Sequence, residues 1–340
     1  MKDDAVKKIF YLLLFLLLLA LGAAGICFQL YRKGIPERSG ETVAVRVEQG
    51  QNARQAAMEF ERAGAVTSAR VLAWRMARMG IDKKLVPGVY RVTAGLPWDV
   101  ALQLANMKPE IPSATIIPGA TFEEIAGTIG RSDGETLLIS ALGDENNFPP
   151  ELRKLLPAGE RDRIVLLSPE TYAVVSGDKI AAGLVASASA MWWKQHGALL
   201  PEAVKSADLN SLGIMASMVQ KEALIPEDGP VIAGVINNRL ESDMLLQIDA
   251  TVVYAWRLLG VKKTNLTYND LKVDSPFNTY IFKGLPPGNI GVPGRDSWDA
   301  VLKPADTDKF FYFARADGRH VFTRTYNEHL EAQRKERNRK

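Results

Sequence analysis

The sequence has few of the residues from which metal centres and disulfide frameworks are built. Among 340 residues there is one cysteine, Cys27, and there are three histidines, His196, His320 and His329. A single cysteine excludes an internal disulfide, and the histidines share no ligand spacing. We therefore expect no metal site and no cofactor, and we expect the histidines to lie at the surface or to cap helices.

Several catalytic motifs and an excess of charge are also missing. The sequence contains no G-x-x-x-x-G-K-[ST] loop, no G-x-G-x-x-G turn, no H-E-x-x-H and no G-x-S-x-G elbow. Its 42 basic and 39 acidic residues give a net charge of +3, and the residues up to Lys33 carry the whole excess. In the rest of the chain the basic and acidic residues are equal in number, so there is no excess of positive charge that would indicate nucleic-acid binding.

One long hydrophobic segment lies near the start of the chain. Between Ile9 and Tyr31 there is no charged residue, and a helix of this length would measure about 34 Å against a hydrocarbon core of about 30 Å. We predict a cytoplasmic tail over residues 1–8, a single transmembrane helix over 9–31 and a linker over 32–42. A cleaved signal peptide is the competing interpretation, because residues 20–25 are small. The flanking charges barely distinguish the two orientations.

The rest of the sequence predicts two α+β domains, a small one over residues 43–110 and a larger one over 111–340. In the first, alternating and helical patterns predict strands at 43–47 and 88–92 and helices at 52–63, 68–79 and 97–107. In the second, we predict a strand at 114–118, a helix with Glu123 and Glu124 in its first turn, and a hairpin of 310–314 and 320–323. Further helices are predicted at 178–196, 210–224, 230–240, from 250, at 297–302 and from 327.

Glu222 stands out because it falls on the apolar side of a predicted helix. Leu212, Met215 and Val219 follow the spacing of a core-facing stripe, and Glu222 continues it, whereas Lys221 points away. A carboxyl group in apolar surroundings has a raised pKa and can act as a general acid near neutral pH. The alternative is a structural ion pair with Arg239 on the next helix. Spacing alone does not separate the two.

Polar residues gather in the loops that follow this helix. Gln247 and Asp249 are two apart, as are Asn278 and Tyr280, so each pair would face one side of an extended segment. Amides, a hydroxyl and an acid, without prominent cationic residues, suit a neutral polyhydroxyl ligand better than a phosphate. Asp249 is also well placed to cap a helix that begins at Ala250.

Several blocks of the sequence occur together in an order that resembles a known family. They are ASMVQKE at 216–222, NRL at 238–240, LQIDATVVY at 246–254, NTY at 278–280, GLPPG at 284–288 and PG at 293–294. Their order and spacing over residues 212–329 resemble the MltG/YceG-like endolytic murein transglycosylases. The resemblance implies a membrane helix, a LysM-like domain over 43–110 and a catalytic transglycosylase domain over 111–340. It also implies a single-pass protein of the cell inner membrane with its bulk in the periplasm.

The resemblance assigns residues as well as a reaction. The family's catalytic glutamate, the second acid of an E-K-E motif, falls on Glu222, and the first acid falls on Gln220. The substrate-binding residues would be Gln220, Gln247, Asp249, Thr251, Asn278 and Tyr280. The substrate would be nascent peptidoglycan glycan strands, cut at the MurNAc-GlcNAc β-1,4 bond to give 1,6-anhydroMurNAc ends, and peptidoglycan synthases in the inner membrane are the implied partners.

Two other functions remain open at this point. Gln220 motivates a membrane-anchored peptidoglycan-binding protein without catalysis. Asp249 could instead serve as the second carboxylate of an ordinary glycan hydrolase, because retaining and inverting hydrolases need two carboxylates that flank the bond. The chemistry of the product ends separates all three functions.

Overall fold

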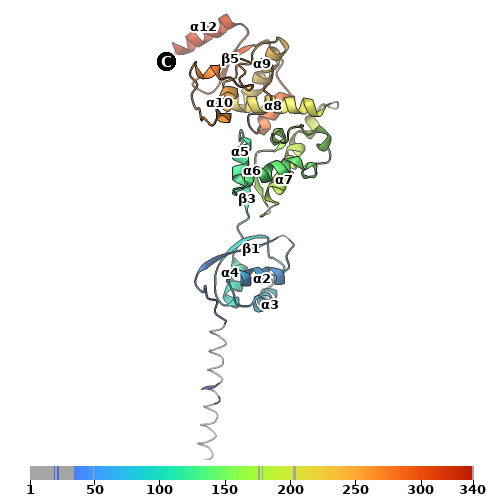
Figure 1. Ribbon diagram of the computed structural model, residues 1–340, viewed down its shortest axis with the longest axis vertical. Coiled ribbons are helices and arrows are strands. Elements are labelled where there is room, and N and C mark those ends of the chain that lie inside the picture. Colours follow the sequence, from blue (N-terminus) through green and yellow to red (C-terminus); the bar gives the residue numbers. More distant parts are fainter. Residues whose placement is uncertain are drawn as a thin grey trace, which may run out of the picture. The chain divides into compact units, whose positions relative to one another are not determined.

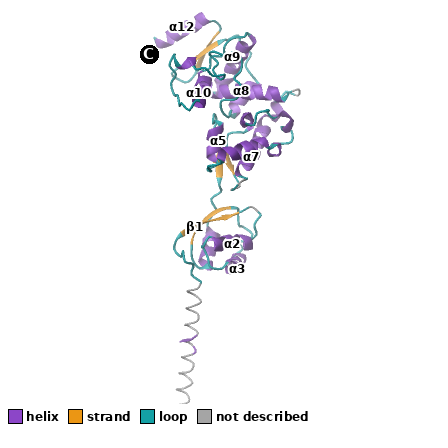
Figure 2. Ribbon diagram, in the orientation of Figure 1, coloured by secondary structure: helices purple, strands orange, loops and turns teal. Residues whose placement is uncertain are grey.

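The computed structural model describes residues 19, 21–22, 34–48, 50–174, 177, 179–201 and 204–338. The predicted tail over 1–8 lies outside the described residues, as does the predicted membrane segment over 9–31 apart from residues 19, 21 and 22. Within the described part, no helix combines the length and the hydropathy needed to cross a bilayer. The chain divides into two compact units, Met1–Pro112 and Ser113–Lys340. Both combine helices with a small amount of sheet (Figure 2), as the predicted α+β class requires.

The first unit is built on a two-stranded antiparallel sheet. Strands β1 (Thr42–Val47) and β2 (Gly88–Thr93) pair along their whole length, and alternate residues of β1 are buried. Three helices complete the core: α2 (Ala53–Arg62), α3 (Ala69–Arg78) and α4 (Pro97–Asn106). Asn52 and Ser68 cap α2 and α3 through their side-chain oxygens, which explains why the predicted bounds of these elements are confirmed to within about two residues.

The second unit is mainly helical (Figure 1). Its helices are α5 (Phe122–Thr128), α6 (Gly134–Gly143), α7 (Ile180–His196), α8 (Ser206–Glu222), α9 (Gly229–Glu241), α10 (Asp249–Leu258), α11 (Arg295–Leu302) and α12 (Tyr326–Arg337). Two antiparallel pairs of strands accompany them, β3 (Ser113–Thr115) with β4 (Thr171–Ala173) and β5 (Phe311–Ala314) with β6 (His320–Thr323). Three 3₁₀ turns lie between α6 and β4, at Glu145–Asn147, Arg153–Leu155 and Arg161–Leu166.

Helix α8 runs through the core of the second unit and packs against α9 and α11. Every residue from 213 to 219 is buried, so the predicted single apolar stripe was too narrow. A Cβ at Gly213 would lie 2.6 Å from Val165 Cγ2, which shows how closely the surrounding chain approaches the helix. The predicted start at 210 is wrong because Asp208 accepts a hydrogen bond from the Lys205 amide at 3.0 Å and so anchors a helix that begins at Ser206.

Two predicted surface positions are wrong, and one predicted helix start lies outside the described residues. That start is Asp178, and the residue before α7 is Lys179. Asp228 precedes α9 but its side chain does not cap the helix. Two of the three histidines are buried rather than superficial: His196 is 1% exposed, and the side chain of His320 is 3% exposed because it packs on the hairpin against Asp228.

Candidate active site

Glu222 is the last residue of α8 and opens onto a pocket of about 290 Å³ within the second unit. The pocket lies between the start of α5, the end of α8 and one face of α10. Its lining residues are Thr121, Lys221, Glu222, Asp249, Ala250, Val253, Tyr254, Arg257 and Ile290. The predicted catalytic residue therefore lies at a concave surface that could admit a ligand.

The surroundings of Glu222 favour its protonated form. The pKa of this carboxyl is raised to about 7, chiefly by burial and in smaller part by the nearby Asp249 carboxylate. The Tyr312 hydroxyl, which donates to Glu222 Oε2 at 3.0 Å, acts in the opposite direction, as do the Ala250 amide and the charge of Arg239. A carboxyl group with this pKa can both donate and accept a proton at neutral pH.

Arg239 does not form the ion pair with Glu222 that the structural alternative requires. Its guanidinium donates to two backbone carbonyls, Phe310 O from Nε at 2.6 Å and Leu246 O from Nη1 at 2.6 Å. The first carbonyl precedes β5 and the second precedes α10. Arg239 therefore ties together two segments that border Glu222, and the Glu222 carboxyl is left to face the pocket.

Asp249 and Tyr280 lie together beside Glu222. The Tyr280 hydroxyl donates to Asp249 Oδ1 at 2.5 Å, and both residues interact electrostatically with Glu222. Asp249 is the first residue of α10 and not its cap, because the cap position belongs to Ile248. The structure thus brings three of the predicted site residues into one cluster.

Thr251 and Asn278 do not face the pocket. Both are fully buried. The Thr251 hydroxyl donates to Ile248 O at 2.7 Å and lies 2.9 Å from the Thr279 hydroxyl, while the Asn278 amide donates to Leu271 O and Val273 O. In this structure the two side chains satisfy backbone groups of the loops that carry Asp249 and Tyr280, and their contact with substrate stays a prediction.

Gln220 and Gln247 also lie away from the pocket lining. Gln220 Oε1 accepts hydrogen bonds from the Gly294 amide at 2.7 Å and the Ser297 hydroxyl at 2.9 Å, so it holds the start of α11. Gln247 is exposed and has a positive φ of 49°, so the segment is not extended there and Gln247 does not share a face with Asp249. Neither glutamine lines the Glu222 pocket, and substrate binding by them stays a prediction.

Comparison with known proteins shows which family this chain belongs to. The model of the YceG-like family matches residues 45–335. The chain belongs to the YceG-like family. It is 27% identical to the endolytic murein transglycosylase of Bacillus subtilis over 93% of this chain and 91% of that protein.

Two further relatives agree with this assignment. The endolytic murein transglycosylase of Streptococcus pneumoniae is 27% identical over 82% of this chain, and the match spans 55% of the pneumococcal protein. The crystal structure of a YceG-like protein from Listeria monocytogenes superposes with a TM-score of 0.54, at 26% identity, over 86% of this chain and 99% of that one.

Two cationic side chains, Lys221 and Arg257, lie at the pocket of this YceG-like chain. Lys221 is exposed, as expected for a side chain that points away from the core, and it also lines the pocket, where its Nζ donates to Gly119 O at 2.7 Å. Arg257 lies on the same wall and donates to Glu124 Oε1 at 2.9 Å. Burial lowers the pKa of Lys221. The pocket therefore has two cationic side chains beside its acid, each with a hydrogen-bond acceptor in the chain itself, and the expectation of a neutral polyhydroxyl ligand stays a prediction.

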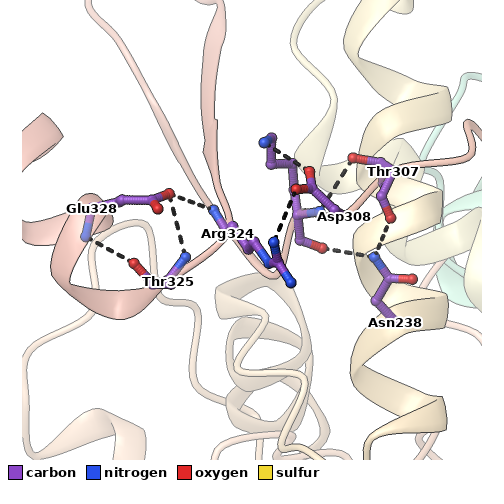
Figure 3. A network of polar contacts seen from close by, with 7 residues as sticks. Asn238, Thr307, Asp308, Arg324, Thr325 and Glu328 are labelled. Atoms are coloured by element: carbon purple, nitrogen blue, oxygen red, sulfur yellow. Dashed lines mark hydrogen bonds and ion pairs between the residues drawn. The ribbon is translucent and has the colours of Figure 1, made fainter.

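Sequence reasoning predicted the β5–β6 hairpin but missed its contacts with Glu222 and α9. Tyr312 on β5 contacts Glu222, and His320 on β6 contacts Asp228 at the start of α9. The segment before β5 is held to α9 by Asn238, whose Nδ2 donates to Thr307 O at 2.8 Å and Lys309 O at 2.9 Å (Figure 3). The local turn and strand patterns predicted a hairpin here, but they contain no signal for which helix the hairpin would contact.

Proposed function

We propose that this chain is an endolytic murein transglycosylase that uses Glu222 as its general acid and base. The observation that carries the proposal is the position of Glu222: a partly buried carboxyl with a pKa raised to about 7, at a pocket, in a chain that belongs to the YceG-like family. The substrate is the glycan strand of peptidoglycan. The bond cut is the β-1,4 bond between MurNAc and GlcNAc.

The reaction needs one carboxyl group in two protonation states. Protonated Glu222 gives its proton to the glycosidic oxygen as the bond breaks. The resulting carboxylate then takes the proton of the muramyl C6 hydroxyl, whose oxygen attacks the anomeric carbon of the same sugar. The product ends in a 1,6-anhydroMurNAc ring, no water is consumed, and Glu222 is protonated again at the end.

The decisive experiment replaces Glu222 with a residue that cannot donate a proton. We expect Glu222→Gln to fold normally and to lower the rate of anhydro-end formation by about 10³-fold, because the amide cannot act as an acid at neutral pH. The full-length chain is incubated with nascent glycan strands, and the product ends are identified by mass spectrometry. Glu227→Gln is the matched control, since Glu227 is exposed and lies on the short turn before α9.

Each alternative function gives a different product. Reducing ends in place of anhydro ends would indicate a hydrolase, for which Asp249 beside Glu222 could provide the second carboxylate. Binding of glycan without cleavage by the unaltered chain would indicate a peptidoglycan-binding protein. Full anhydro-end formation by Glu222→Gln would overturn the role of Glu222.

The membrane setting is a second part of the proposal. The apolar segment over 9–31 anchors the chain in the inner membrane and the bulk of the chain faces the periplasm, where the glycan substrate lies. Support comes from the sequence, which has no charged residue between Ile9 and Tyr31. The LysM-like nature of residues 43–110 and contact with inner-membrane peptidoglycan synthases stay predictions.

Fractionation tests the anchor. After alkaline carbonate washing, the full chain should stay in the membrane pellet, and protease added to spheroplasts should degrade the second unit. Release of the full chain by the wash would contradict the anchor, and protection from protease would contradict the orientation.

A further inference from the structure

The hydroxyl group of Tyr312 reaches the end of α8 from a strand 90 residues further along the chain. It donates to Glu222 Oε2 at 3.0 Å. We propose that Tyr312 is a positioning residue that orients the Glu222 carboxyl and stabilises its carboxylate form between the two proton transfers. The reaction step rests on the function proposed above, whereas the contact with Glu222 does not.

The ring of Tyr312 is held on one face of the β5–β6 hairpin. Tyr312 lies opposite Phe322 in the register, and their ring centroids are 6.0 Å apart. On the same face, His320 meets the Tyr312 ring edge-on, at 5.6 Å and 79°. Aromatic contacts of this kind are specific in geometry, so they restrict where the Tyr312 hydroxyl can point.

His320 is in turn fixed to the start of α9 by Asp228. The Oδ2 atom of Asp228 accepts from the His320 backbone amide at 2.7 Å and lies 2.9 Å from its Nδ1. A carboxylate oxygen accepts hydrogen bonds, so Nδ1 of His320 is the donor. The two side chains are 3% and 14% exposed, and in such a dry setting this pair anchors β6 firmly.

The other strand of the hairpin is anchored to the same helix. Asn238 holds the carbonyls of Thr307 and Lys309, as Figure 3 shows for Thr307. The next residue of α9, Arg239, holds the carbonyl of Phe310. Tyr312 thus follows a segment whose backbone is tied to α9 at three carbonyls. The hydroxyl that meets Glu222 is placed by the fold and not by a mobile loop.

The direction in which Tyr312 shifts the pKa of Glu222 follows from the groups that face this carboxyl. A donor to a carboxylate favours the charged form, and the Tyr312 hydrogen bond lowers the pKa of Glu222 against the raising effect of burial. Removing the hydroxyl should therefore raise that pKa. The other charged and titratable groups around Glu222 are Asp249, Arg239, Tyr280, Lys221 and Arg257.

The test is the pH profile of Tyr312→Phe in the full-length chain. The acid step requires protonated Glu222, so the rate of anhydro-end formation should fall as pH rises through the pKa of Glu222, which is about 7. We expect Tyr312→Phe to move this limb to higher pH by about one unit and to lower the maximal rate about 10-fold. Tyr326→Phe is the matched control, because Tyr326 is 58% exposed on α12, and it should leave the profile unchanged.

A direct titration makes the outcome independent of turnover. The carboxyl carbon of Glu222, labelled with ¹³C and assigned through Glu222→Gln, can be titrated by NMR in the unaltered chain and in Tyr312→Phe. A rise of about one unit supports the proposal. An unmoved titration overturns it, even if the rate falls at every pH, because that pattern indicates a structural role alone. If the unaltered chain forms no anhydro ends, the proposed function fails while the titration still decides the Tyr312 contact.

Discussion

Two polar side chains in the last turn of α8, Gln220 and Glu222, have different surroundings. On one side, the side-chain carbonyl oxygen of Gln220 accepts hydrogen bonds from two donors at the start of α11. On the other, Glu222 meets the Tyr312 hydroxyl and the Ala250 amide at an open pocket, and its pKa is raised to about 7. A side chain whose acceptor is satisfied by its own protein holds the fold, whereas one left partly unsatisfied beside a cavity is available for chemistry.

The largest expected effect tests the burial of Glu222 through the pH dependence of stability. Because its pKa is raised from 4.5 to about 7, the folded chain binds a proton more tightly than the unfolded chain. Wild-type stability should therefore fall as pH rises through this window. The Glu222→Gln variant lacks this penalty and should gain up to about 3 kcal/mol on the wild type between about pH 4 and about pH 8.

Denaturant unfolding at both pH values measures this gain. The Glu227→Gln control should follow the wild type, because Glu227 is exposed. If Glu222→Gln and wild type keep the same difference at both pH values, Glu222 is not desolvated in the folded chain and the contrast with Gln220 disappears.

The second expected effect lies on the Gln220 side. Gln220→Ala leaves the Gly294 amide and the Ser297 hydroxyl without their acceptor. We expect a loss of about 1.5 kcal/mol in the free energy of unfolding, as for the loss of a helix cap. Chemical denaturation measures it. An unchanged midpoint would mean that water replaces Gln220 at the start of α11 and that this side of the turn is not structural.

A smaller effect is expected at Asp249. Its carboxylate raises the pKa of Glu222, so Asp249→Asn should lower that pKa by about half a unit, the direction opposite to Tyr312→Phe. The titration of Glu222 in the full chain detects the shift. A rise instead would show that Asn at 249 disturbs the Tyr280 contact and changes the burial of Glu222.

The smallest effect is expected for Gln220→Glu, which restores the acid of the family's E-K-E motif. A carboxylate oxygen can accept the same two hydrogen bonds, and a negative charge is favourable near the start of α11. We expect stability within about 0.5 kcal/mol of the wild type and an unchanged Glu222 titration. A shift in that titration would reveal coupling between the two sides of the turn.

Local signals predicted much of the fold. The helices predicted at 52–63 and 68–79 and the hairpin predicted at 310–314 and 320–323 are confirmed, because caps and turns depend on residues close in sequence. The start of α8 was missed because Lys205 is an unusual residue at a cap position. The 3₁₀ turns over 145–166 have no periodicity that a sequence pattern could detect.

The site was harder to predict because its contacts are distant in sequence. One helical stripe singled out Glu222 as a candidate but did not decide its role, and the substrate contacts of the polar loop residues stay predictions. Thr251 and Asn278 satisfy backbone groups in this structure. The contacts of Tyr312 and Lys221 depend on how β5 and Gly119 approach α8. Periodicity describes an element's faces, but it does not describe which distant segment covers each face.

The contact between Glu222 and Tyr312 also orders events during synthesis of the chain. The ribosome adds Tyr312 90 residues after Glu222, so a growing chain carries the acid long before it carries the hydroxyl that orients it. The hairpin completes the site only when nearly the whole second unit has been made. An unfinished chain would therefore hold an acid whose carboxyl group is not yet oriented, and the site would become complete only when the last strands fold into place.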